Sequence, residues 1–137
     1  MKPHRYLRAY LAGIAVPTPL LLVAMTGYTV FRLIYHFPVP VERVIVFPMA
    51  VIPNAWGLWN VLFIFWRDRL HVSIGLHGAL LPFLLAPLGI AVAGVLNFSI
   101  PSFAVHLFPI AAPLGLIAYY LAWKYLVGFL NRLVDLG

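Results

Sequence analysis

The stretch from Val44 to Trp66 limits the possible folds more than any other part of the chain, because it is largely apolar and contains no charged residue. A helix rises about 1.5 Å per residue, so a helix over this stretch is long enough to cross the ~30 Å apolar core of a bilayer. Its middle, Phe47–Asn60, nevertheless holds two prolines, a glycine, two asparagines and two tryptophans. We therefore predict a membrane-spanning helix that is bent here and packed against other protein.

The composition of the whole chain agrees with a membrane protein. The mean hydropathy is +1.02 and only 9% of the residues are charged, whereas a soluble domain carries about 25% charged residues. The chain has no cysteine, which excludes disulfides, thiolate metal sites and cysteine nucleophiles. The net charge of +6 comes from basic residues at the ends of apolar runs, so topology explains it and nucleic-acid binding is not expected.

Four apolar runs predict an all-α integral membrane protein with a single domain, residues 1–137. The expected transmembrane helices cover residues 9–36, 41–66, 72–97 and 102–130. The first run is longer than the ~7–15 apolar residues of a signal peptide, so we expect it to remain uncleaved. The short connections predict an antiparallel bundle. Arg67–His71 is expected to form a charged loop, and Ser102 to cap the fourth helix.

The basic residues predict the orientation. One face carries Lys2, Arg5, Arg8, Arg67, Arg69, Lys124 and Arg132, whereas the other carries only Arg32 and Arg43. Positive residues accumulate on the cytoplasmic side, so both termini are expected in the cytoplasm of a bacterial-type inner membrane.

A shift of 61 residues aligns the two turns on the other face. Phe37, Pro40, Val44, Phe47, Pro48 and Ala50 then coincide with Phe98, Pro101, Val105, Phe108, Pro109 and Ala111. This match predicts a two-helix internal repeat whose halves share one orientation. The alternative is biased composition combined with similar requirements at two helix starts.

Each predicted span carries two prolines, namely Pro17 and Pro19, Pro48 and Pro53, Pro82 and Pro87, and Pro109 and Pro113. An interior proline frees a backbone carbonyl, which needs a protein or water partner in lipid. One interpretation is a set of bent helices around a cavity. The other is that proline is common in membrane helices.

Several residues could line a pathway or a ligand site: Pro53, Asn54, Trp56, Trp59, Asn60 and His77. At about 100° per residue, Asn54 and Asn60 point about 120° apart, so we do not expect them to share one site. Each asparagine could form a hydrogen bond between helices or line a pathway. His77 could be a buried, hydrogen-bonded side chain or a group that titrates near neutral pH.

The remaining chemistry is limited. His36 and His106 are expected at similar depth on the first and fourth helices, where paired histidines could hold a b-type haem. The acidic residues Glu42, Asp68 and Asp135 lie at span ends, which argues against a carboxylate proton relay. The sequence contains no catalytic motif and no metal motif.

Three functional hypotheses follow. The first is a transporter or channel subunit that acts as a homo-oligomer, because four spans barely enclose a pathway. The second is a non-catalytic assembly or binding subunit of a larger membrane complex. The third is a haem-binding membrane subunit. Each has the lipid bilayer and another membrane protein, or a second copy, as its expected partners.

Overall fold

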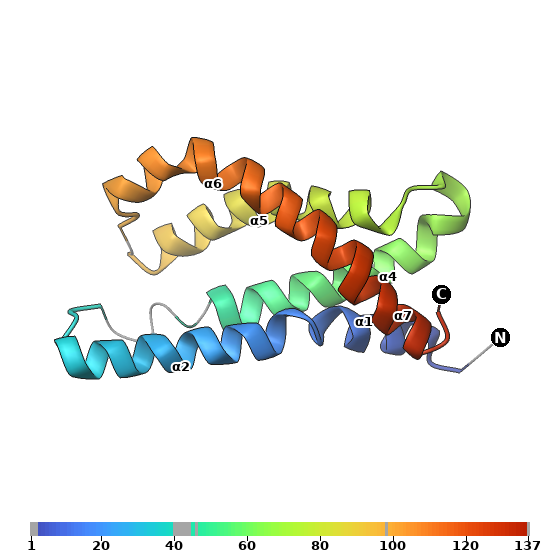
Figure 1. Ribbon diagram of the computed structural model, residues 1–137, viewed down its shortest axis with the longest axis horizontal. Helices are drawn as coiled ribbons and strands as arrows, with labels where there is room; N and C mark the ends of the chain where they lie inside the picture. The colour runs from blue at the N-terminus through green and yellow to red at the C-terminus, as the bar shows by residue number, and fades with distance from the viewer. Residues whose placement is uncertain (1–2, 40–44, 46, 98, 137) are drawn as a thin grey trace.

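The computed structural model describes residues 3–39, 45, 47–97 and 99–136. All regular structure in these residues is helical, and four helical stretches in them are long and apolar enough to cross a membrane. They cover Arg5–Tyr35, Phe47–Leu70, Ile74–Val95 and Ser102–Leu133 (Figure 1). The predictions of an all-helical chain and of four helices able to span a membrane are thus confirmed.

Three of these four candidate spans are divided into shorter segments. The first consists of α1 (Arg5–Ile14) and α2 (Pro17–Tyr35), and the second of the π-helix η1 (Phe47–Val51) and α4 (Ile52–Leu70). The third is the continuous helix α5 (Ile74–Val95). The fourth consists of α6 (Ser102–Leu121), the π-helix η2 (Ala122–Val127) and α7 (Gly128–Leu133).

Prolines mark the junctions within the first two candidate spans. Pro17 begins α2, and Pro53 lies in the first turn of α4. A first-turn N–H has no partner within its helix, so a residue without an N–H is tolerated there. Two prolines lie inside α5 and two inside α6. The η2 segment contains no proline, so its wide turn has another origin.

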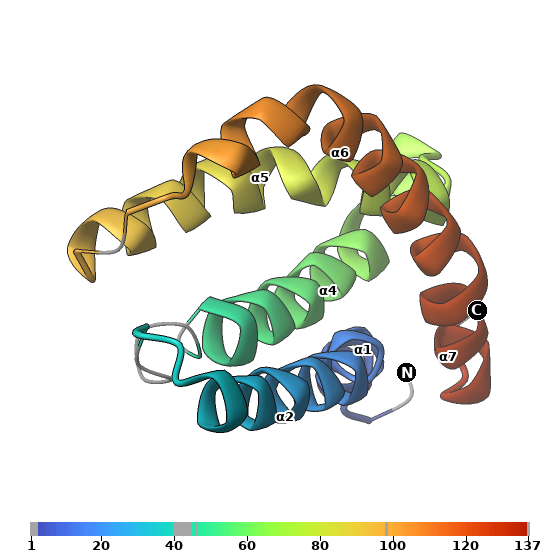
Figure 2. The ribbon, with the colours of Figure 1, turned by 60° about the vertical axis from the view of Figure 1, so that its left-hand side comes forward.

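The helices form two pairs. Helix α1 packs along α4, and α5 packs along α6 and η2. The pairs meet where α4 leads into α5 and where α7 turns toward α1, and they diverge toward the opposite end (Figures 1 and 2). The first and last helices, α1 and α7 (Gly128–Leu133), both lie where the pairs meet (Figure 1). We call this part, formed by α1, residues 64–73 and residues 128–136, the terminal end.

The chain reverses direction from each candidate span to the next (Figure 1). The antiparallel bundle and the two-helix repeat nevertheless stay predictions. Pro48 lies in the π-helix η1, whereas its repeat counterpart Pro109 lies inside α6. Three of the aligned residues, Pro40, Val44 and Phe98, lie outside the described residues.

The connection between the second and third candidate spans differs from the sequence prediction. Residues 67–70, predicted as a loop, form the last turn of α4, and residues 71–73 make the connection to α5. Basic side chains such as Arg67 and Arg69 are favourable near the negative end of a helix dipole, which explains why charge does not end the helix. Helix α5 begins after Ser73, whose side chain accepts a hydrogen bond from the Leu76 N–H at 3.3 Å.

The first and last residues of the candidate spans also differ from those predicted from the sequence. The first begins at Arg5 rather than at residue 9, and the fourth continues to Leu133 rather than to residue 130. Ser102 is the first helical residue, and Pro101 occupies the cap position without a side-chain hydrogen bond. The predicted start of the second span at residue 41 lies outside the described residues.

A glycine allows α1 and α4 to approach closely. A Cβ atom on Gly13 would lie 2.5 Å from the Trp56 carbonyl oxygen and 2.8 Å from Gly57 Cα. These are backbone atoms, which cannot move away as the end of a flexible side chain can. Small residues permit this kind of close packing between membrane helices.

We predict that Gly13→Ala lowers the free energy of unfolding by about 1–3 kcal/mol, the usual cost of overpacking a tight contact. Gly27→Ala is the matched control in the same candidate span, because a Cβ there has no neighbour within 4 Å. Thermal unfolding followed by circular dichroism in detergent measures both. Equal Tm values for the two variants would contradict the tight contact.

Candidate functional site

The most buried polar contact joins two asparagines of the second and fourth candidate spans. Asn60 is 0% exposed and Asn131 is 3% exposed. Each side-chain amide donates to the other's Oδ1, at 2.8 Å from Asn60 and 2.9 Å from Asn131. The Asn60 amide also donates to the Ala9 carbonyl oxygen at 2.7 Å. One side chain thus connects α4 to both α7 and α1.

His77 of α5 is held in an aromatic site. Its ring stacks on Trp59 with a centroid distance of 4.7 Å, and Phe63 and Trp123 lie at 5.3 Å and 5.7 Å. His77 Nε2 lies 2.8 Å from the Trp59 carbonyl oxygen, and Trp59 Nε1 donates to the His77 carbonyl oxygen at 2.7 Å. A carbonyl oxygen only accepts, so Nε2 carries the proton. The reciprocal pair fixes α5 against α4.

Trp56 completes the contact between the helix pairs. Its ring lies 5.3 Å from Trp123 and 5.1 Å from Tyr119, and its Nε1 donates to the Tyr119 hydroxyl at 3.4 Å. Trp123 belongs to the π-helix η2 and packs over Gly78 of α5, where there is no side chain to exclude the indole. Because π-turns often occur at functional sites, η2 makes this aromatic contact a candidate for a functional role.

Asn54 lies apart from this group, beside Pro53 at the start of α4. Its Oδ1 accepts a hydrogen bond from the Tyr10 hydroxyl, and its Nδ2 donates to the Ala50 carbonyl oxygen of η1 at 2.6 Å. Pro53 itself is buried, whereas Asn54 is exposed on the surface of the chain. Asn54 and Asn60 therefore have different partners.

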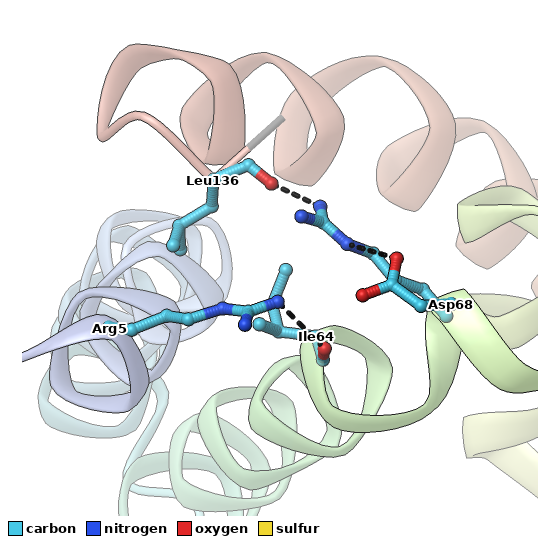
Figure 3. Close-up of polar contacts among 5 residues, drawn as sticks. Arg5, Ile64, Asp68 and Leu136 are labelled. Carbon is cyan, nitrogen blue, oxygen red and sulfur yellow. Dashed lines mark hydrogen bonds and ion pairs between the residues drawn. The ribbon is translucent and has the colours of Figure 1, made fainter. Parts of the chain in front are cut away.

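Arginines at the terminal end donate to backbone carbonyl groups (Figure 3). Arg5 Nη2 donates to the Ile64 carbonyl oxygen at 3.2 Å, and Arg8 Nη1 to that of Val134 at 2.8 Å. Arg67 Nη1 donates to the Leu136 carbonyl oxygen. The bond of Arg5 joins α1 to α4, and the bonds of Arg8 and Arg67 hold Val134 and Leu136 against these two helices.

Two hollows open at the terminal end beside these side chains. The smaller, of about 130 Å³, is lined by Trp59, Phe63, Trp66, Arg67, Leu70, Val72, His77 and Leu80. The larger, of about 540 Å³, is lined by Phe63, Arg67, Asp68, His71, Val72, Ser73, Ile74, Gly128, Asn131 and Arg132. The lining of the first is largely aromatic and aliphatic, and that of the second combines apolar surface with the basic residues Arg67 and Arg132.

The haem hypothesis depended on His36 and His106. His36 ends α2 in a left-handed conformation, and His106 lies in α6; both side chains are exposed. Helices α2 and α6 belong to different pairs, with α4 and α5 between them (Figure 2). Within the described residues, no three histidine or carboxylate side chains are grouped as metal ligands.

The structure thus brings together Trp56, Trp59 and His77 in one aromatic cluster through Trp123. Asn60, on the same helix α4, bonds instead to Ala9 and Asn131. Sequence reasoning missed Asn131, Tyr10 and Arg67 as partners. Asn131 and Arg67 were placed in terminal and loop segments, where no partner across the bundle is expected. Comparisons with protein-family models, characterised proteins and solved structures find no significant match.

We predict that Asn60→Leu and Asn131→Leu each lower the free energy of unfolding by about 1–3 kcal/mol, because each leaves a buried amide without its partner. The double variant should lose less free energy of unfolding than the sum of the two single losses, since it removes both amides together. Denaturant unfolding in detergent provides the comparison. Strictly additive costs would show that the two amides do not interact.

Proposed function

We propose that the chain is a transporter or channel subunit that acts as a homo-oligomer, with its pathway between copies. The observation that carries this proposal is the Tyr10–Asn54 hydrogen bond. Asn54 is exposed although it lies within a candidate membrane span. A polar group that faces lipid is costly, so this face needs another protein surface or water against it.

The backbone around Asn54 supports the same proposal. The π-helix η1 ends directly before α4, and Pro53 provides no N–H to a carbonyl group there. Interrupted helices with available carbonyl groups form the binding sites of many transporters. Neither hollow at the terminal end has Asn54 or Tyr10 in its lining, which favours a pathway between copies over one within a single copy.

The proposed lining is polar but uncharged. It consists of the Asn54 amide and the Tyr10 hydroxyl, with the Ala50 carbonyl oxygen bonded to the amide. Glu42, Asp68 and Asp135 lie toward span ends in the sequence. Such a lining suits small polar solutes or weakly hydrated ions. It does not suit coupling to protons through a carboxylate.

We predict that liposomes containing the protein show flux of at least one of glycerol, urea, potassium or chloride. Asn54→Leu should lower this flux about tenfold, the change expected for about 1.4 kcal/mol of lost interaction. Thr26→Val is the matched control, because Thr26 is exposed in α2 and bonds only to the Leu22 carbonyl oxygen of its own helix. Flux no higher than in protein-free liposomes for all four solutes would reject the transport proposal.

A second candidate is a non-catalytic assembly subunit of a larger membrane complex. It is favoured by Asn60, Trp59 and His77, whose polar atoms bond to other helices rather than to a pathway. Under this proposal the Asn54 face binds a different protein. Purification under mild conditions distinguishes the two, because a stoichiometric second protein supports assembly and a homo-oligomer of defined mass supports transport.

We also propose that the protein lies in a bacterial-type inner membrane with both termini in the cytoplasm. The lack of cysteine makes the orientation easy to test by single substitutions. Phe37 and His71 are exposed and follow the C-terminal ends of α2 and α4. These two helices run in opposite directions (Figure 1), so the two residues are expected on opposite sides of the membrane. In intact cells, Phe37→Cys should react with a membrane-impermeant maleimide, and His71→Cys should react only after permeabilisation. The reverse labelling pattern would invert the proposed orientation.

A further inference from the structure

The larger hollow at the terminal end has the chemistry of an anion site. Its lining residues include two arginines, Arg67 and Arg132, together with His71, Asn131 and one acidic residue, Asp68. Two fixed positive charges against one negative charge leave the lining net positive. Its volume of about 540 Å³ is large enough for a phosphate group with its substituents.

Arg67 is already oriented for such a ligand. Its side chain is 27% exposed, and its Nε lies 3.6 Å from Asp68 Oδ1. Its Nη1 donates to the Leu136 carbonyl oxygen (Figure 3). These two contacts fix the guanidinium plane, and Nη2 has no hydrogen-bond partner within the described residues. A fixed guanidinium with available donors matches the geometry of phosphate oxygens.

The other walls of the larger hollow are also favourable to a negative charge. Arg132 is exposed, and its side chain makes no hydrogen bond or ion pair within residues 3–39, 45, 47–97 and 99–136. Ile74, the first residue of α5, lies in the lining, and the first turn of α5 carries no acidic residue. The positive end of a helix dipole therefore adds to the two arginines.

An apolar space adjoins the charged one. The smaller hollow shares Phe63, Arg67 and Val72 with the larger and continues along Trp59, Trp66 and Leu80. A ligand that fills both has an anionic head and an apolar chain. Basic pockets between helices on the cytoplasmic side of a membrane bind anionic lipid headgroups in this way.

We infer that the terminal end binds a phosphate-bearing anion through Arg67 and Arg132, with the phosphate of an anionic lipid headgroup as the ligand that uses both hollows. A free phosphate compound has the same head chemistry but leaves the smaller hollow empty. This inference concerns a different site from the Asn54 face and holds whether or not the protein transports a solute.

The test uses full-length protein in nanodiscs that contain equal amounts of phosphatidylglycerol and phosphatidylcholine. Native mass spectrometry after release into detergent measures which lipid remains bound. Arg132→Gln is the decisive variant, because it removes a charge without breaking any hydrogen bond described above. Arg69→Gln is the matched control, since Arg69 belongs to the same helix turn as Arg67 but does not line the hollow.

We expect the wild-type protein to retain phosphatidylglycerol over phosphatidylcholine by about tenfold, the effect of one charge-assisted interaction. Arg132→Gln and Arg67→Gln should lose this preference, and Arg69→Gln should keep it. In a second arm, inorganic phosphate alone is added to lipid-depleted protein, and the shift in Tm is measured. A shift that Arg132→Gln abolishes, without lipid preference, supports the same site with a soluble ligand.

Two results would overturn the inference. One is equal retention of the two lipids together with no effect of phosphate on Tm. The other is a loss of the preference for phosphatidylglycerol that is as large in Arg69→Gln as in Arg132→Gln. The preference would then come from the net charge of the protein rather than from the hollow.

Discussion

The buried amide of Asn60 is the interaction on which the rest of the arrangement depends. In lipid, a buried polar group must find its partner within the protein, and Asn60 finds one in Ala9 and another in Asn131. The bond to Ala9 requires α1 to lie close to α4, and Gly13 makes that approach possible. One side chain therefore sets the distance between the first two candidate spans and the position of the last turn of the fourth.

The contacts of His77 and Trp123 extend this arrangement to α5. The reciprocal hydrogen bonds between His77 and Trp59 tie α5 to α4, and Trp123 in η2 fills the space over Gly78. All of these contacts lie toward the terminal end, whereas α6 buries no residue between Ser102 and Leu121. The two helix pairs are consequently joined at one end and diverge at the other (Figure 2).

The helical class and the number of candidate spans are predictable from the sequence, because a long apolar run is a property of consecutive residues. The sequence also predicts that Asn54 and Asn60 do not share one site, because their spacing along a helix makes them point in different directions. It missed the Asn60–Asn131 pair, since nothing local links residues that are 71 positions apart. The loop prediction for residues 67–70 was wrong because charge alone does not end a helix. Arg67 donates a hydrogen bond to the distant Leu136 carbonyl oxygen, which composition does not reveal.

The polar groups of the chain fall into two sets with different consequences. Asn60, Asn131 and His77 satisfy one another or the backbone inside the chain, so their hydrogen bonds stabilise the terminal end and are not free for a solute. Asn54 and Tyr10 satisfy one another on an exposed face. If the chain conducts or transports, the second set is the one available, and the pathway then needs a neighbouring copy to shield it from lipid. Function at that face therefore depends on assembly, whereas the basic hollow at the terminal end is complete in a single copy.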